Sequence, residues 1–164
     1  MTSATKTSSP TSVHFDPHWK SIMECAVVEV FELMAGVRLE LVATPGREAL
    51  GEQTAMVGMA GALCGMTTVR CSRAAAGKLA SLMLGQDAAT NPAMTRDALG
   101  EICNMIAGNF KAKVSNLADH CLLSVPTVIT GEDYFVESVP PTNAVTLALA
   151  YEGECIWVSL ITHS

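Results

Sequence analysis

The sequence lacks any long uninterrupted apolar run, although apolar residues make up 49% of its 164 residues. No stretch approaches the roughly 18–20 apolar residues that a membrane-spanning helix needs, so we expect no contact with a membrane. The high apolar fraction also excludes intrinsic disorder as a description of the whole chain. A chain of this length can bury most of its apolar surface in one domain, so a core or an interface must hide these side chains.

Charge is also scarce, and positive charge is in the minority. Only 16% of the residues are charged, and ten Lys and Arg stand against sixteen Asp and Glu, for a formal net charge of −6. Proteins that bind nucleic acid through a basic face show the opposite balance. The composition therefore excludes nucleic acid as the expected partner.

Six cysteines are present, but there is no Cys-x-x-Cys pair and no histidine at metal-ligand spacing. The cysteines are scattered through the chain, at positions 25, 64, 71, 103, 121 and 155. Most lie among apolar residues, where a free thiol behaves as a small hydrophobic group. The first residues, Met1 to Lys6, contain no apolar segment typical of a signal peptide. These features predict a reduced, cytoplasmic protein with no metal site and no cofactor of its own.

The chain divides into a tail and one domain. Residues 1–13 are rich in Ser and Thr and predict a disordered tail, so the domain is expected over residues 14–164. Apolar residues at helical spacing predict a helix that starts with Asp16 as N-cap and Pro17 in its first turn, and ends at Gly36. Further helices are predicted over residues 72–84 and from about 93 to 117.

Segments without a helical period predict strands, most of them in the last third of the chain. The predicted strands are 37–43, 54–60, 63–71, 121–125, 128–129, 134–138, 144–151 and 155–162. The order helix, strands, helix, strands is typical of an α+β domain and not of parallel βαβ units. Residues 29–36 align with residues 101–108 at four of eight positions, which suggests an internal duplication. Chance similarity between two amphipathic helices explains this match as well as common descent does.

The long helix over 93–117 carries a polar stripe. Asp97, Glu101, Asn104 and Gly108 fall at spacings that place them on one face, and Gly100 borders that face. The apolar residues on the other side can pack on a sheet: Leu99, Ile102, Cys103, Ile106 and Phe110. Each glycine inside a helix is about 1 kcal/mol less favourable than alanine. We therefore expect another surface to approach the helix closely at Gly100 and Gly108.

The stripe presents one carboxylate and one carboxamide, three residues apart. Glu101 can pair with a cation, and the Asn104 amide can both donate to and accept from a water molecule. Because an amide is no general base near neutral pH, its catalytic use would be to orient a water for attack. The alternative is a solvated helix face on which Asp97 and Glu101 keep the domain soluble. Asn and Gly in mid-helix favour the functional interpretation, because a plain solvent face favours Lys, Glu, Gln or Ala.

The pattern Asp97-x-x-x-Glu101-x-x-Asn104, followed by Pro126 after a strand, resembles the signature of the CheC/CheX/FliY chemotaxis phosphatases. Residues 100–109 and 123–131 are most similar to the CheX branch, and the resemblance covers roughly residues 17–161. It implies an α+β fold in which an antiparallel, about six-stranded sheet packs against two long related helices and a shorter one.

The resemblance also implies a function. These proteins hydrolyse the aspartyl phosphate of a CheY-like receiver domain, which supplies the Mg²⁺ ion and most of the charge stabilisation. By similarity, Glu101 would engage the lysine of the receiver and Asn104 would hold the attacking water in line. Four residues would contribute to partner binding: Asp97, Gly100, Gly108 and Pro126. Positioning and electrostatics carry most of phosphoryl transfer, so the chain itself would need no cofactor.

The first predicted helix departs from the family signature. Glu29 matches Glu101, but Glu32 stands where the signature requires the asparagine. A carboxylate there would add negative charge beside the phosphoryl transition state, so we expect this half to be silent. A single motif is typical of CheX proteins, which are homodimers, and a homodimer with two sites is the expected assembly. Two alternatives remain: a non-catalytic receiver-binding or motor-associated module, and a dimerisation domain that buries the face over residues 97–108.

Overall fold

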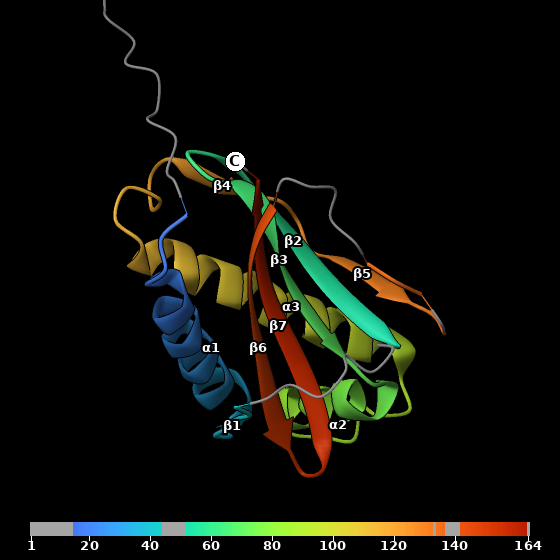
Figure 1. The fold of residues 1–164 in the computed structure, drawn as a ribbon. Coiled ribbons are helices and arrows are strands. Elements are labelled where there is room, and N and C mark those ends of the chain that lie inside the picture. Colours follow the sequence, from blue (N-terminus) through green and yellow to red (C-terminus); the bar gives the residue numbers. More distant parts are fainter. Residues whose placement is uncertain (1–14, 44–51, 133, 137–141, 164) are drawn as a thin grey trace, which may run out of the picture.

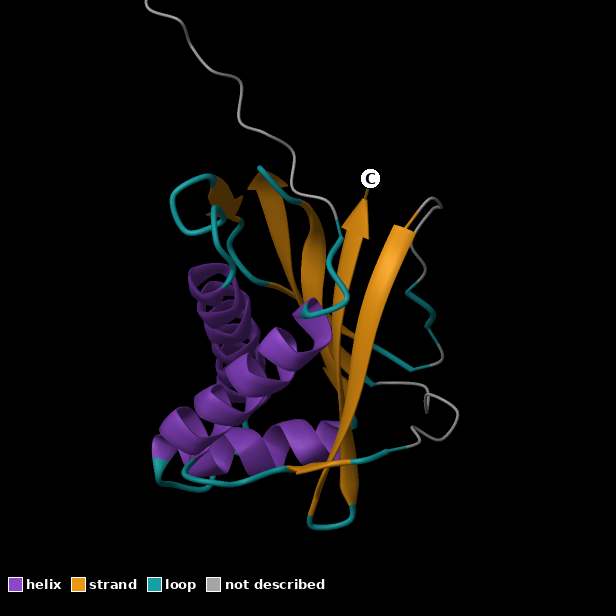
Figure 2. Ribbon diagram, turned by 60° about the vertical axis from the view of Figure 1, so that its left-hand side comes forward, coloured by secondary structure: helices purple, strands orange, loops and turns teal. Residues whose placement is uncertain are grey.

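Three helices lie against one face of an antiparallel sheet in the computed structural model of the chain (Figures 1 and 2). The structure describes residues 15–43, 52–132, 134–136 and 142–163. The helices are α1 (Trp19–Ala35), α2 (Arg73–Leu84) and α3 (Pro92–Lys113). The strands are β1 (Glu40–Leu41), β2 (Gln53–Gly61), β3 (Cys64–Cys71), β4 (Cys121–Leu123), β5 (Thr127–Thr130), β6 (Thr142–Tyr151) and β7 (Glu154–His163). The predicted α+β fold is confirmed, with seven described strands where about six were expected.

The sheet has the strand order β1-β6-β7-β3-β2-β4, and β5 also pairs with β2. All of these pairings are antiparallel. Alternate residues of the strands point to the helices, as the pleat requires. Ala55 and Val57 of β2 and Val158 and Leu160 of β7 are fully buried there, in one core cluster with Ile106 of α3. The excess of apolar residues noted in the sequence thus fills the layer between sheet and helices.

The topology has an internal two-fold relationship between a first half, from α1 to β3, and a second half, from α3 to β7. The hairpins β2–β3 and β6–β7 meet at the centre of the sheet through the pairing of β3 with β7. The strand that follows α1 pairs with the second hairpin, and the strands that follow α3 pair with the first. If β1 is exchanged with β4, β2 with β6 and β3 with β7, the result is the same strand order read from the other edge of the sheet. This symmetry agrees with the duplication that the sequence suggests.

Helix α1 begins two residues later than predicted, with His18 and not Asp16 at the N-cap position. Asp16 is not its N-cap, because the Asp16 carboxylate accepts from the backbone N–H of His18 at 2.8 Å and closes a turn before the helix. The predicted end is confirmed, since Gly36 stands at the C-cap in the left-handed region, with φ of 64°.

The other two helices also differ from the prediction at one end. Ser72 is the N-cap of α2 and accepts from the backbone N–H of Ala75, so the helix proper begins at Arg73. Helix α3 ends at Lys113 and not at residue 117, because Val114 has an extended backbone.

Two strand predictions require correction. Over residues 37–43 only Glu40 and Leu41 form a strand, which pairs with the edge of β6. Residues 134–136 form no strand; instead the Tyr134 hydroxyl lies 2.7 Å from Oγ1 of Thr54, in hydrogen-bond contact. Residues 137–138 of that predicted strand, and the predicted tail over 1–13, lie outside the described residues.

Candidate functional site on helix α3

Helix α3 is anchored at its start and along its inner face. The Asn91 side chain accepts from the backbone N–H groups of Ala93 at 3.1 Å and Met94 at 3.2 Å, and Pro92 occupies the first turn. The predicted inner face is confirmed, since five residues are at most 1% exposed: Leu99, Ile102, Cys103, Ile106 and Phe110. The opposite face is thereby held in a fixed orientation.

That opposite face presents the predicted polar stripe. Asp97 and Glu101 are exposed, while Asn104 and Gly108 are half-buried. Neither the Glu101 carboxylate nor the Asn104 carboxamide forms a hydrogen bond or ion pair with another described residue. The two groups are three positions apart on the helix, a rise of about 4.5 Å, so they point to the same side within one turn. Both groups are therefore available to a partner.

Pro126 reaches this helix because of an irregularity at the edge of the sheet. Met59 of β2 pairs with Leu123, and Met56 pairs with Thr127, so three residues (124–126) oppose two of β2. Such a bulge at a sheet edge suits proline, which has no backbone N–H to donate. Ser124 fixes the bulge, because its hydroxyl accepts from the Gly58 backbone N–H at 2.9 Å.

The bulge places Pro126 over Gly100. A Cβ on Gly100 would lie 3.3 Å from the Cβ of Pro126 and 3.6 Å from Cγ2 of Val128. The close approach expected at Gly100 is thus confirmed. At Gly108 a Cβ would meet nothing within 4 Å, so no surface of the described chain approaches it. Any closely approaching surface at Gly108 would have to come from outside the described residues.

An open depression of about 400 Å³ forms where α3 meets the bulge. Its lining residues are Arg96, Asp97, Gly100, Glu101, Pro126 and Val128. The structure therefore brings together four predicted site residues, Asp97, Gly100, Glu101 and Pro126. Asn104 lies one turn further along the stripe and does not line the depression. Arg96 was missed by the sequence reading, since nothing in its spacing separates it from any exposed arginine.

The corresponding face of α1 is occupied by partners within the chain. The Glu29 carboxylate accepts from the Lys113 ammonium, at 2.8 Å and 2.9 Å, and from the Asn109 carboxamide at 3.0 Å. The bonds from Lys113 and then Asn109 lower the pKa of Glu29 from 4.5 to about 2. Glu32 pairs with Arg38 at 3.2 Å. Glu29 and Glu32 of α1 are thus in ion pairs, whereas Asp97 and Glu101 of α3 form none with the described residues.

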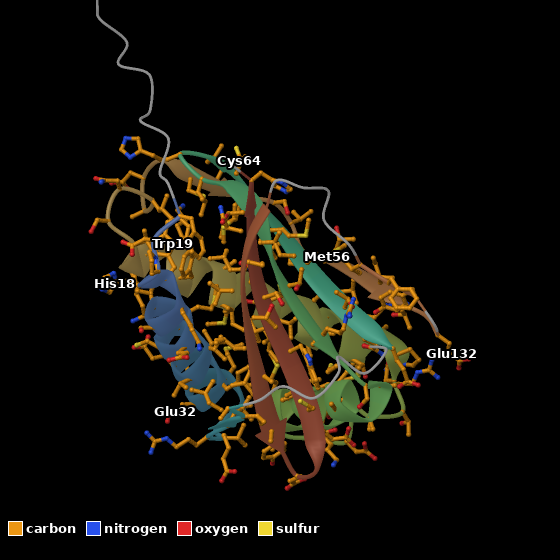
Figure 3. The ribbon with its side chains drawn as sticks, viewed as in Figure 1. His18, Trp19, Glu32, Met56, Cys64 and Glu132 are labelled. Atoms are coloured by element: carbon orange, nitrogen blue, oxygen red, sulfur yellow. The ribbon has the colours of Figure 1, made fainter. Side chains whose placement is uncertain are left out.

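The cysteines take no part in this site. All six are free thiols. Cys103 and Cys71 lie in the core, where burial raises the pKa of each thiol to about 12. Figure 3 shows Cys64 at the end of the sheet near β4, away from the labelled residues of α1. No group of three or more metal-binding side chains occurs among the residues that the structure describes.

None of the helices in the described part of the chain is both long and apolar enough to cross a membrane.

An antiparallel sheet packed on three helices is the fold of the CheC/CheX-like α+β domains. The family model "Chemotaxis phosphatase CheX" matches residues 53–149, more than half of the chain. The chain belongs to the chemotaxis phosphatase CheX family. A search of curated protein sequences finds no match.

Solved structures show the same fold. Chemotaxis protein CheX from Vibrio vulnificus is 16% identical, with a TM-score of 0.78 over 92% of this chain and 100% of that one. CheX from Desulfovibrio desulfuricans is 23% identical, with a TM-score of 0.77 over 89% and 99%. A structure described as the CheX–CheY–BeF3–Mg²⁺ complex from Borrelia burgdorferi is 22% identical, with a TM-score of 0.77 over 89% and 98%.

Proposed function

We propose that this chain hydrolyses the aspartyl phosphate of a CheY-like receiver domain that docks on α3. One observation carries the proposal: Glu101 and Asn104 stand on one face of an anchored helix with no partner among the described residues. Membership of the CheX phosphatase family supports the reaction. The complex of a similarly folded CheX with CheY supports the choice of partner.

The reaction needs a water oxygen placed in line with the bond between phosphorus and the aspartyl oxygen. As that oxygen bonds to phosphorus, the bond to the aspartyl oxygen breaks, and the products are phosphate and a free carboxylate. The Asn104 carboxamide can accept from the water and donate to it, which fixes its direction of approach. Holding the water in this geometry removes entropy from the barrier and requires no titrating group.

Glu101 has a different role in this proposal. Its exposed carboxylate binds the ammonium group of a receiver lysine by a charge-assisted hydrogen bond. This pairing draws the phosphorylated site toward Asn104, one turn along the helix. Asp97, Gly100, Gly108 and Pro126 contribute to the docking surface. The Mg²⁺ ion belongs to the receiver, and the chain contributes no ligand to it.

The proposal extends to assembly and location. In α1, Glu29 and Glu32 are in ion pairs with Lys113 and Arg38, so each chain offers one site, on α3. A homodimer would place two such sites in one assembly. Receiver domains of chemotaxis act in the cytoplasm, so the proposal places this chain there.

The test measures phosphate release from purified phosphorylated receivers. We expect Asn104→Ala to abolish the acceleration while leaving receiver binding largely intact, and Glu101→Ala to weaken both. Glu32→Gln, at the matching position of α1, is the control and should hydrolyse at the parent rate. Parent-rate hydrolysis by Asn104→Ala would contradict the mechanism. Binding of the receiver without acceleration by the parent protein would identify a non-catalytic receiver-binding or motor-associated module instead.

A further inference from the structure

A second depression, of about 300 Å³, adjoins the one on α3, and Arg96 lines both. Its lining comes from the start of β2, the first turns of α2 and α3, and the end of β5. Figure 1 shows where these elements lie. Its lining residues are Gln53, Arg73, Ala89, Pro92, Thr95, Arg96 and Thr130. The proposed phosphatase mechanism uses none of these residues.

Two guanidinium groups, those of Arg73 and Arg96, flank this depression. Arg73 and Arg96 are exposed, and neither forms an ion pair with a described residue. The carboxylate of Glu52 is close by but accepts from the backbone N–H of Arg73, at 2.7 Å, where it caps the start of α2. In a chain with a net charge of −6, two such arginines on one depression form a local positive site.

The wall of the depression contains a buried amide with an unmet hydrogen bond. Gln53 is only 3% exposed, and its Oε1 has no partner among the described residues. A half-turn of the amide exchanges its oxygen and nitrogen, so this end can offer an acceptor or a donor. The Thr95 hydroxyl, by contrast, already donates to backbone carbonyls within the chain. An anion held by both arginines could satisfy Gln53 as well.

We propose that this depression binds a carboxylate side chain of the receiver domain that docks on α3. The inference rests on the proposed function. Guanidinium groups recognise carboxylates through paired, charge-assisted hydrogen bonds. Because Arg96 lines both depressions, a partner seated over Asp97 and Glu101 also covers the arginine site.

The two depressions carry opposite charge, so the docking surface distinguishes one orientation of the partner from the reverse orientation. Asp97 and Glu101 lie on one side of Arg96, and Arg73 lies on the other. A receiver that presents a lysine to Glu101 and a carboxylate to the arginines fits in one orientation only. Charge complementarity of this kind fixes the alignment of partners and speeds their encounter. The arginine site would thereby align the receiver phosphate with Asn104.

The test compares steady-state hydrolysis of a phosphorylated receiver by the parent and by the double variant Arg73→Ala/Arg96→Ala. We expect KM to rise about tenfold in the double variant, kcat to stay near the parent value, and the salt dependence of KM to weaken. Lys20→Ala, which removes an exposed cation on α1, is the matched control and should leave KM unchanged.

A second variant, Gln53→Leu, separates an effect on receiver binding from an effect on the stability of the fold. Gln53→Leu replaces the unmet amide by an apolar side chain of similar size, so the melting temperature should be equal or higher. Calorimetric binding of a beryllofluoride-activated receiver should nevertheless weaken. A purely structural role of Gln53 predicts the opposite, with stability and affinity falling together.

Other outcomes overturn the inference in distinguishable ways. An unchanged KM in the double variant, with an active parent, removes the arginine site and leaves the proposed function standing. Inorganic phosphate that raises the melting temperature of the parent but not of the double variant, with KM unchanged, would assign the site to a free anion. A parent that neither binds nor hydrolyses any phosphorylated receiver refutes the proposed function itself.

Discussion

Gly100 of α3 lies directly against Pro126 of the β4–β5 bulge, and a Cβ on the glycine would lie 3.3 Å from that of the proline. Glycine in a helix interior is about 1 kcal/mol less favourable than alanine. The contact explains why the helix contains glycine here, because a Cβ would press on Pro126 and shift the bulge by a few tenths of an ångström. With the bulge seated, Pro126 and Glu101 line one depression.

Substitution of this glycine should affect docking more than folding. In Gly100→Ala the new Cβ displaces Pro126 by a few tenths of an ångström, while alanine favours the helix. We expect the free energy of unfolding to change by less than about 1 kcal/mol and KM for the receiver to rise severalfold. Urea unfolding and phosphate-release kinetics measure the two effects. An unchanged KM would show that the position of Pro126 does not matter for docking.

Gly108 is the opposite case to Gly100, because no described residue packs closely against it. A Cβ there meets nothing within 4 Å in the described chain, so Gly108→Ala should stabilise the protein by about 0.5–1 kcal/mol. We expect this variant to bind the receiver more weakly, because the added methyl group lies on the docking face. Thermal unfolding and calorimetric binding measure the two effects. Stabilisation with unchanged binding would remove Gly108 from the partner-binding residues.

The ion pair between Glu29 and Lys113 should make stability depend on pH. The pKa of the Glu29 carboxyl is about 2 in the folded protein, against an ordinary value of 4.5. Because the folded pKa is the lower one, the pair stabilises the folded state above about pH 4.5, and this contribution is lost as pH falls toward 2. We expect Glu29→Gln to flatten the pH dependence of the unfolding free energy in that window.

Urea unfolding between pH 2 and 6 measures this dependence, at low and at high salt. The effect should shrink at high salt, because both side chains are partly exposed. Glu40→Gln is the control, since Glu40 is exposed and has no ion pair in the described part of the chain. Equal slopes for Glu29→Gln and the parent would contradict the prediction.

The thiols should differ sharply in reactivity. Cys25 and Cys64 are exposed, whereas Cys71, Cys103 and Cys121 are buried. Burial raises the pKa of all three buried thiols, so at pH 8 they are protonated and shielded. Brief treatment of the folded protein with iodoacetamide should alkylate Cys25 and Cys64 first, as peptide mass spectrometry would show. Early modification of Cys103 would mean that α3 opens readily from the sheet.

The sequence was sufficient to predict the fold class, the three helices and the stripe on α3. Those predictions rest on periodicity, which is a local property. The N-cap prediction at Asp16 was wrong because its carboxylate closes a local turn with His18, which helical periodicity does not indicate. The prediction of a strand over 37–43 was wrong because the two-residue length of β1 depends on pairing with β6, which is distant in the sequence.

The candidate site also contains features that local helical spacing predicts and features that depend on contacts between distant segments. Asp97, Glu101 and Asn104 could be placed on one face because a helix fixes their spacing. The contact of Gly100 with Pro126 was expected only as a close approach of some surface, since the bulge that creates it depends on pairing with β2. The ion pair of Glu29 with Lys113 and the arginine-lined depression join segments far apart in the chain, and no sequence signal indicates them. The catalytic roles stay predictions.

Because strands of one half of the chain pair with strands of the other, the two halves depend on each other structurally. Strands β4 and β5, which flank Pro126, pair only with β2 among the described strands, and β2 belongs to the half whose own helix lacks the asparagine. The half without a complete motif therefore supplies β2, the strand with which β4 and β5 of the other half pair on either side of Pro126. Deleting it would remove the support of the active half, so neither half is expected to fold or function as a separate fragment.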